Sequence, residues 1–360
     1  MAPTRRPLGP SLFSRFRRRE QPAARKALYM AQRDCCLAIP PIVGVSHGSG
    51  SRECEASSAA AHASLMSRPN EDFASAFVTA PDGLMLNVRS YGSRLASALP
   101  VVCLPGLART AADFHCLATE LAAGPAAPRL VVALDYRGHG RSQYDRNPDN
   151  YVLSIDLADV LAVLSALGIA PAVFVGTSYG GLLAMMLAVA RPTIIAGVIL
   201  NDIGPVIEPR GLLRIKRCLG KLSTPRSFVE GGEILSWLMG AQFPRLTAKD
   251  WIAFAQRTWR EHDGRLLPDY DVKLARTLRR ANLERPPTLW HQFDALARVP
   301  LMIIRGANSD VLASTTLDAM LARRGKLEVA VVPDQGHAPL LAETRLIRQI
   351  AAFAASCDPS

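Results

Sequence analysis

One serine in the chain has the neighbours that a catalytic nucleophile needs. Ser178 lies within the segment 176–181 (GTSYGG), directly after the apolar run 172–175 and just before the apolar run 182–190. The small residues permit a turn tight enough to hold the serine oxygen outward at a helix N-terminus, which favours developing negative charge. The alternative role for Ser178 is that of a helix N-cap in a glycine-rich turn. The pattern favours a serine that attacks a carbonyl carbon.

A serine hydroxyl becomes nucleophilic with a base beside it, and the base needs an acid that orients it. Among seven histidines His337 is the best placed, because it follows the last apolar run on a loop beside glycine and proline. Two acids, Asp202 and Asp310, follow earlier apolar runs. We favour Asp310, because the order Ser, Asp, His then places the three residues at successive strand ends. Asp202 is the alternative acid, and a helix N-cap is the alternative role for Asp310.

Transfer of an acyl group also requires hydrogen-bond donors for the oxygen that becomes negative. The backbone N–H of Tyr179, next to Ser178, is one predicted donor. The N–H of Leu107 is the other, in the loop that follows the apolar run 100–104. Gly106 in this loop permits close approach, and we expect it to contact the substrate.

The elements that carry these residues alternate between strand and helix. Eight short runs are typical of strands: 73–80, 84–91, 100–104, 129–134, 172–175, 196–200, 301–304 and 327–332. Four stretches are typical of helices: 110–121, 152–167, 179–190 and 340–355. Apolar strands that alternate with helices predict a doubly wound, mostly parallel α/β sheet with helices on both faces and ligands at the carboxyl ends of its strands. The first two runs flank the turn 81–83 (PDG), which predicts an antiparallel hairpin at one edge.

Residues 207–290 separate two predicted strands by more than an ordinary crossover needs. The stretch is mostly helical in pattern and contains all four tryptophans: Trp237, Trp251, Trp259 and Trp290. Such tryptophans often fill only a small core of their own. Because the insertion follows the sixth strand, we predict a helical lid over the pocket, with Trp237 and Trp251 contacting the substrate. Residues 66–206 and 291–360 form the predicted core.

Residues 1–65 differ from the rest of the chain in composition. They contain ten Lys and Arg but four Asp and Glu, so they carry +6 of the net charge of +11. Because they lack apolar periodicity, we predict a disordered basic leader. This leader is either a targeting peptide or an upstream extension of a reading frame that starts at Met66. The small charge of the remainder gives no reason to predict a nucleic-acid partner.

The cysteines exclude one class of site and suggest a compartment. The seven cysteines do not have the spacing of metal ligands, so no metal is predicted. Their odd number, without an export signal, indicates reduced thiols in the cytoplasm. The longest dense apolar stretch, 182–190, is half a membrane span, so no membrane partner is predicted. The sequence makes no prediction of the oligomeric state.

In combination these motifs resemble the α/β-hydrolase superfamily over roughly residues 73–356, especially its lidded bacterial esterases and enol-lactonases. The matching segments are 104–107 (LPGL), 135–142 (DYRGHGRS), 176–181, 306–310 (GANSD) and 336–337 (GH). The resemblance implies the triad Ser178, Asp310 and His337, the oxyanion donors Leu107 and Tyr179, and no cofactor. It also implies a mainly structural role for 135–142, where we read His139 as a loop residue that borders the pocket.

The chain departs from the family at the oxyanion loop. Pro105 stands where many members have histidine, which leaves open how the loop is supported. A single glycine in that loop goes with ordinary esters in the superfamily, and a serine nucleophile argues against epoxide hydrolases and haloalkane dehalogenases.

The leading hypothesis is therefore a serine hydrolase that cleaves a small carboxylic ester or lactone through an acyl-enzyme. Carbon–carbon bond hydrolases and acyltransferases use the same triad and form the second hypothesis. A ligand-binding protein that kept the fold without its activity is the third.

Overall fold

The computed structural model of the protein describes residues 72–124, 128–280 and 286–359. The predicted leader and Met66 lie outside these ranges. The strands are β1 Ala74–Thr79, β2 Met85–Tyr91, β3 Val101–Leu104, β4 Val131–Leu134, β5 Ala172–Thr177, β6 Ile195–Asn201, β7 Trp259–His262, β8 Arg265–Pro268, β9 Leu301–Gly306 and β10 Glu328–Val332. The α-helices are α2 His115–Ala123, α3 Leu153–Leu167, α4 Tyr179–Ala190, α5 Pro209–Cys218, α6 Phe228–Met239, α7 Ala248–Gln256, α8 Ala275–Arg280, α9 Trp290–Asp294, α10 Ser314–Arg323 and α11 Thr344–Ser356, and a short 3₁₀ helix, η2 Ala111–Phe114, precedes α2.

Eight strands form one sheet in the order β1-β2-β4-β3-β5-β6-β9-β10. β2 pairs antiparallel with β1 and with β4, and every other neighbouring pair is parallel. All eight coincide with predicted strands to within a few residues, so the predicted doubly wound α/β sheet with its edge hairpin is confirmed. The nucleophile strand β5 lies near the middle, between β3 and β6.

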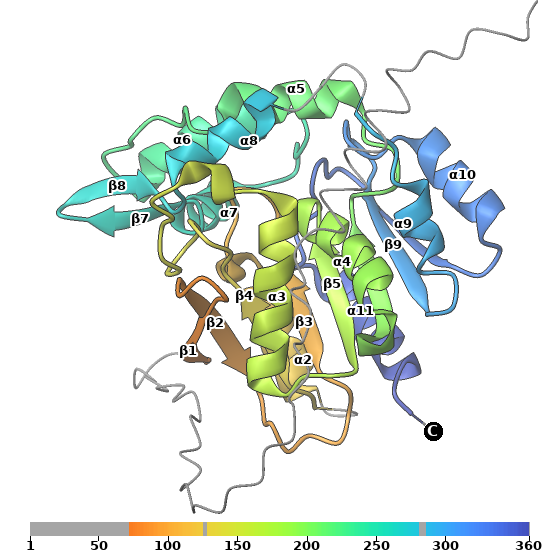
Figure 1. Cartoon of the computed structure of the whole chain (residues 1–360). Coiled ribbons are helices and arrows are strands. Elements are labelled where there is room, and N and C mark those ends of the chain that lie inside the picture. Colours follow the sequence, from red (N-terminus) through yellow and green to blue (C-terminus); the bar gives the residue numbers. More distant parts are fainter. Residues whose placement is uncertain (1–71, 125–127, 281–285, 360) are drawn as a thin grey trace, which may run out of the picture. The chain divides into compact units, whose positions relative to one another are not determined.

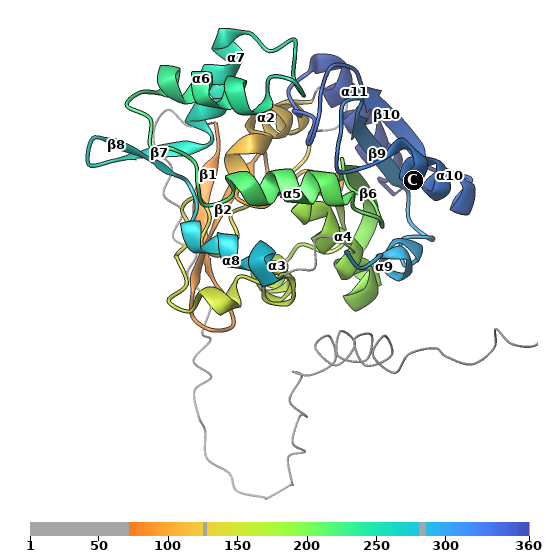
Figure 2. The same cartoon turned by 90° about the horizontal axis from the view of Figure 1, so that it is seen from above.

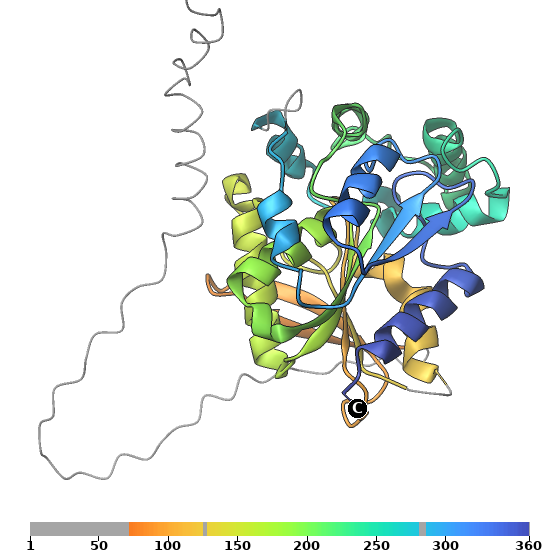
Figure 3. The ribbon, with the colours of Figure 1, turned by 90° about the vertical axis from the view of Figure 1, so that its right-hand side faces the viewer.

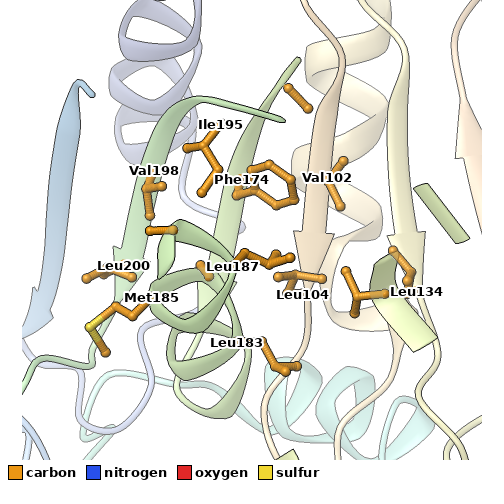
Figure 4. Close-up of a cluster of buried hydrophobic side chains, with 14 of the residues drawn as sticks. Val102, Leu104, Leu134, Phe174, Leu183, Met185, Leu187, Ile195, Val198 and Leu200 are labelled. Atoms are coloured by element: carbon orange, nitrogen blue, oxygen red, sulfur yellow. The ribbon is translucent and has the colours of Figure 1, made fainter. Parts of the chain in front are cut away.

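Helices cover both faces of the sheet (Figures 1 and 3). One apolar cluster joins the sheet to α3, α4, α9 and α10, and a second joins the other face to α2 and α11. Within β5 the side chain of Phe174 belongs to the first cluster, and those of Val173 and Val175 belong to the second. Figure 4 shows Phe174 beside Val102 of β3 and near α4. Burial on both faces explains why the central strands are apolar without alternation.

The described part of residues 207–290, which we call the cap segment, contains helices α5 to α8 between β6 and β9, and these helices lie over the sheet (Figures 1 and 2). The structure adds a feature that the sequence analysis missed, an antiparallel hairpin of β7 and β8. Its turn is Asp263-Gly264, and both residues have positive φ, 49° and 70°. An Asp-Gly pair is the typical signal for such a turn, because glycine tolerates this conformation without strain. Within the described part of the chain, no helix is long and apolar enough to cross a membrane.

Candidate active site

Ser178 occupies a strained turn between β5 and α4. Its backbone φ is 50° and its ψ is −112°, a conformation that non-glycine residues rarely adopt. The glycines beside it are needed for space, because a Cβ on Gly180 would overlap the carbonyl oxygen of Leu104. The turn is fixed by the Ser178 N–H, which donates to the carbonyl of Asn201 at 2.9 Å. The serine hydroxyl is thus held at the carboxyl end of the sheet, at the start of α4.

His337 bridges Ser178 and an aspartate. Its Nε2 lies 2.8 Å from Ser178 Oγ, and its Nδ1 lies 2.8 Å from Asp202 Oδ2. The side chain of His337 is 7% exposed and that of Asp202 is fully buried. Since a carboxylate only accepts hydrogen bonds, Nδ1 carries the proton and Nε2 is free to accept from the serine hydroxyl. These three side chains form one continuous hydrogen-bonded chain.

The structure corrects the choice of acid. Asp310 does not contact His337; its carboxylate accepts two hydrogen bonds from Arg214 of α5, at 2.7 and 2.8 Å. The sheet order explains the error, because β6 lies next to β5 and its end is closer to the nucleophile than the end of β9. The chain order of the three residues could not reveal this, since Asp202 and Asp310 both lie between Ser178 and His337 in sequence.

The segment 306–310, which was expected to provide the acid, instead donates hydrogen bonds to Asp202. Asp202 accepts a hydrogen bond from the N–H of Gly306 at 2.9 Å and from the hydroxyl of Ser309 at 2.5 Å. Asp202 has a φ of 56°, which turns its side chain at the end of β6. These hydrogen bonds, together with the one to His337, hold the buried carboxylate in one position. Ser309 was absent from the sequence prediction, and its only signal was its place next to the favoured Asp310.

Side chains of the segment 135–142 form hydrogen bonds with the loop 105–108, which contains the predicted oxyanion donor Leu107. The hydroxyl of Tyr136 donates to the carbonyl of Pro105 at 3.1 Å. Three residues along, the N–H of Ala108 donates to Nε2 of His139 at 3.1 Å, and Ala108 has a φ of 59°. These bonds supply the support whose source was left open by Pro105, where many family members have histidine.

His139 is a structural residue rather than a wall of the pocket. It is 1% exposed, and its Nδ1 lies 2.9 Å from the carbonyl of Arg137. A carbonyl only accepts, so Nδ1 carries the proton and Nε2 accepts from Ala108. Burial lowers the pKa of His139, which keeps the ring neutral and preserves this arrangement at neutral pH. The reading of His139 as a residue bordering the pocket is therefore wrong.

A match to a protein family accompanies this geometry. Residues 101–349 match the model of the alpha/beta hydrolase family. The chain belongs to the alpha/beta hydrolase family. The matched range includes the serine, the histidine and both aspartates discussed above.

Individual relatives agree with the assignment. A 3-hydroxybutyrate-oligomer hydrolase from Cupriavidus necator is 31% identical over 66% of this chain and 82% of that protein. The crystal structure of an alpha/beta hydrolase from Novosphingobium aromaticivorans has a TM-score of 0.72 and 36% identity, and the match covers 79% of this chain and 98% of that one. A 2-(acetamidomethylene)succinate hydrolase from Mesorhizobium japonicum is 24% identical over 58% of this chain and 71% of that protein. Family and relatives together identify an enzyme of hydrolase type.

Ser178 lines a cavity of about 580 Å³ that is open to solvent. Gly106, Leu107 and Tyr179, the residues predicted around the nucleophile, line it together with His337. The cap segment contributes a cluster of apolar side chains to the wall: Leu212, Ile215, Leu219, Leu222, Leu235, Leu238 and Met239. The cavity is therefore bounded by residues at the carboxyl end of the sheet and by residues of the cap segment.

Neither tryptophan predicted to contact the substrate lines this cavity. Trp251 is 5% exposed and packs between Phe243 and Phe254 in the cap segment's own core. Trp237 is 85% exposed on the outer side of α6. The sequence pattern marks an apolar insertion but not the direction of each side chain, so leucines occupy the place expected for Trp237 and Trp251.

The tyrosine beside the nucleophile is tied to a buried acid. The hydroxyl of Tyr179 donates to Asp156 of α3 at 2.6 Å. Burial raises the pKa of Asp156 to about 7, although the hydrogen bond from Tyr179 opposes this. The bond holds the side chain of the first residue of α4 in place. Among the described residues no cluster of His, Cys, Asp and Glu could hold a metal ion.

Proposed function

We propose that this hydrolase cleaves a carboxylic ester or lactone through an acyl-enzyme on Ser178. The observation that carries the proposal is the hydrogen-bonded chain from Ser178 through His337 to Asp202, with 2.8 Å at each step. In this arrangement the histidine can remove the serine proton while the buried carboxylate stabilises the imidazolium that forms.

The proposed reaction has two halves. Ser178 Oγ attacks the carbonyl carbon, its proton passes to His337 Nε2, and the carbonyl oxygen becomes an oxyanion beside the N–H groups of Leu107 and Tyr179. His337 then protonates the leaving alcohol and the acyl-enzyme remains. Water attacks the acyl-enzyme and His337 accepts its proton. His337 then returns this proton to Ser178 Oγ as the carboxylic acid is released.

The apolar wall and one relative support the substrate class. The leucines of the cap segment favour a substrate with a hydrocarbon part. The relative from Cupriavidus necator is named for hydrolysis of 3-hydroxybutyrate oligomers, which are chains of esters. We therefore propose a short ester of this kind as substrate, with residues 207–290 acting as a lid over a core formed by 66–206 and 291–360.

Labelling with a fluorophosphonate and pre-steady-state hydrolysis of 4-nitrophenyl acetate test the proposal. The enzyme should be labelled once per chain and release a burst of 4-nitrophenolate, and Ser178→Ala should abolish both. Ser154→Ala, an exposed serine of α3, is the matched control and should behave as wild type. Labelling that survives in Ser178→Ala would contradict the proposal. Labelling without turnover of any ester would favour carbon–carbon bond cleavage or acyl transfer instead.

A further inference from the structure

One end of the cavity is lined by arginines rather than by leucines. Arg89 reaches it from β2, Arg109 from the loop before η2, and Arg257 from the end of α7. Among the described residues that line the cavity, Asp113 is the one carboxylate. Arg214, the fourth lining arginine, is already paired with Asp310. The arginine end therefore carries more positive than negative charge.

Arg109 and Asp113 satisfy each other. Nε and Nη2 of Arg109 donate to the two oxygens of Asp113 at 2.6 and 2.5 Å, and Nη1 donates to Thr258 Oγ1 at 2.8 Å. The ring of Phe254 lies under this guanidinium at 4.7 Å. With all three nitrogens engaged, Arg109 is a fixed part of the wall and has little left for a ligand.

Arg257 is in a different position. Its Nε lies 3.4 Å from the same carboxylate of Asp113 but is buried without a hydrogen-bond partner among the described residues. The side chain of Arg257 is 27% exposed and lines the cavity. The guanidinium groups of Arg109 and Arg257 share the one carboxylate of Asp113, which leaves one positive charge unmatched there.

Arg89 repeats this pattern. Its Nε is also buried without a hydrogen-bond partner in the described part of the chain, and its guanidinium lies 4.6 Å from the centre of the Phe73 ring. Burial raises the pKa of Asp269 to about 6, and the charges of Arg260, Arg89 and Arg109 oppose this rise, so Arg89 and Arg109 both lie near this carboxyl. Asp269 forms an ion pair with Arg260 at 3.7 Å and does not line the cavity.

We propose that this end of the cavity binds the carboxylate of a substrate that carries its ester some distance away along an apolar chain. Arg257 donates to the carboxylate, Arg89 adds the second positive charge, and Arg109 with Asp113 holds the wall in place. A guanidinium and a carboxylate form charge-assisted hydrogen bonds that are stronger than those between neutral groups. The inference rests on the proposed function for the ester and adds which class of ester is selected.

Binding to Ser178→Ala tests the anion site without hydrolysis. Isothermal titration would compare monomethyl suberate with dimethyl suberate, which has the same chain but no carboxylate. The monoester should bind about tenfold tighter or more, and Arg257→Gln in the same background should remove that preference. Arg89→Gln should weaken the monoester in the same direction. Arg265→Gln, an exposed arginine of β8, is the matched control and should keep the preference.

A series of monoesters of different length would determine the preferred distance between the ester and the carboxylate of the substrate. Monomethyl glutarate, monomethyl suberate and monomethyl sebacate, each against its diester, would show which separation of ester and carboxylate fits. Equal binding of monoester and diester across the whole series would overturn the proposal, as would an equal loss for both in Arg257→Gln. If the enzyme with Ser178 intact hydrolyses neither the monoester nor the diester, the proposed function is refuted. The anion site is judged separately, from the binding measurements on Ser178→Ala.

Discussion

The rim of the sheet and the cap segment enclose the same cavity, yet different interactions build them. At the rim, Ser178, His337 and Asp202 are each held by hydrogen bonds of 2.5 to 2.9 Å to neighbouring strand ends. In the cap segment, leucines form the wall and an aromatic core around Trp251 holds the helices together. Directional bonds fix atoms, whereas apolar packing fixes a volume. Substitutions at the rim should therefore change kcat, and substitutions in the cap segment should change stability or KM.

The largest expected effect separates the two aspartates. Asp202→Asn should lower kcat by about 10⁴-fold, because the histidine loses the charge that stabilises its protonated form. Asp310→Asn should change kcat by less than about tenfold, because its carboxylate serves Arg214 of the cap segment. Steady-state kinetics on one ester, with circular dichroism to verify folding, measures both. Equal losses in the two variants would mean that rim and cap segment are not separated in this way.

The next effect concerns the two tryptophans of the cap segment. Trp251→Ala should lower the free energy of unfolding by about 3–5 kcal/mol, because it empties the centre of the cap segment's core. Trp237→Ala, on the exposed side of α6, should change it by less than about 0.5 kcal/mol. Urea unfolding followed by fluorescence gives both values. A large loss of stability in Trp237→Ala would show that the Trp237 side chain is packed against other residues rather than exposed to solvent.

His139 tests whether a residue beneath the rim acts on the reaction. His139→Ala removes the acceptor for the Ala108 N–H, so the loop with Leu107 should shift and kcat should fall by about 10²-fold. KM should change little, because the apolar wall of the cap segment is intact. Rapid-quench measurement of the acylation rate would locate the loss in the chemical step. An unchanged acylation rate would remove His139 from the support of the oxyanion loop.

The smallest effect is expected at the link between the two regions. Burial raises the pKa of Asp310, but the hydrogen bonds and charge of Arg214 outweigh it, so the pKa lies below its ordinary value. A lowered carboxyl pKa stabilises the folded protein above the unfolded pKa, and this stability is lost as the pH falls through the folded pKa. The free energy of unfolding of wild type should exceed that of Asp310→Asn by about 1–2 kcal/mol at neutral pH. This difference should begin to fall near about pH 4 and disappear only once the pH is below the lowered folded pKa.

Unfolding in urea over a series of pH values measures this difference. Arg214→Gln is the control and should lose as much as Asp310→Asn, while the double variant should lose no more than either. A difference that persists at low pH would show that Asp310 stabilises the protein by some other contact.

The sequence predicted the sheet and part of the site, because these features depend on residues that are close together in the chain. The eight strands and the turn around Ser178 follow from residues adjacent in the chain, such as the apolar run 172–175 and Gly180. The hairpin of β7 and β8 was also readable from Asp263-Gly264 but was overlooked. The inner wall of the cap segment was not readable, because a helical pattern does not say which neighbour each face meets.

What the sequence by itself determined was the fold and the nucleophile's turn, since both depend on short patterns of apolar residues and glycine. What only the tertiary structure decided was which carboxylate faces His337. Asp202 and Asp310 each follow a strand, and the chain order of the residues is satisfied by either. The choice follows from sheet order, which places β6 beside β5, and from Arg214 of α5, which holds Asp310 in place. Contacts between residues far apart in sequence decide it, and no local pattern encodes them.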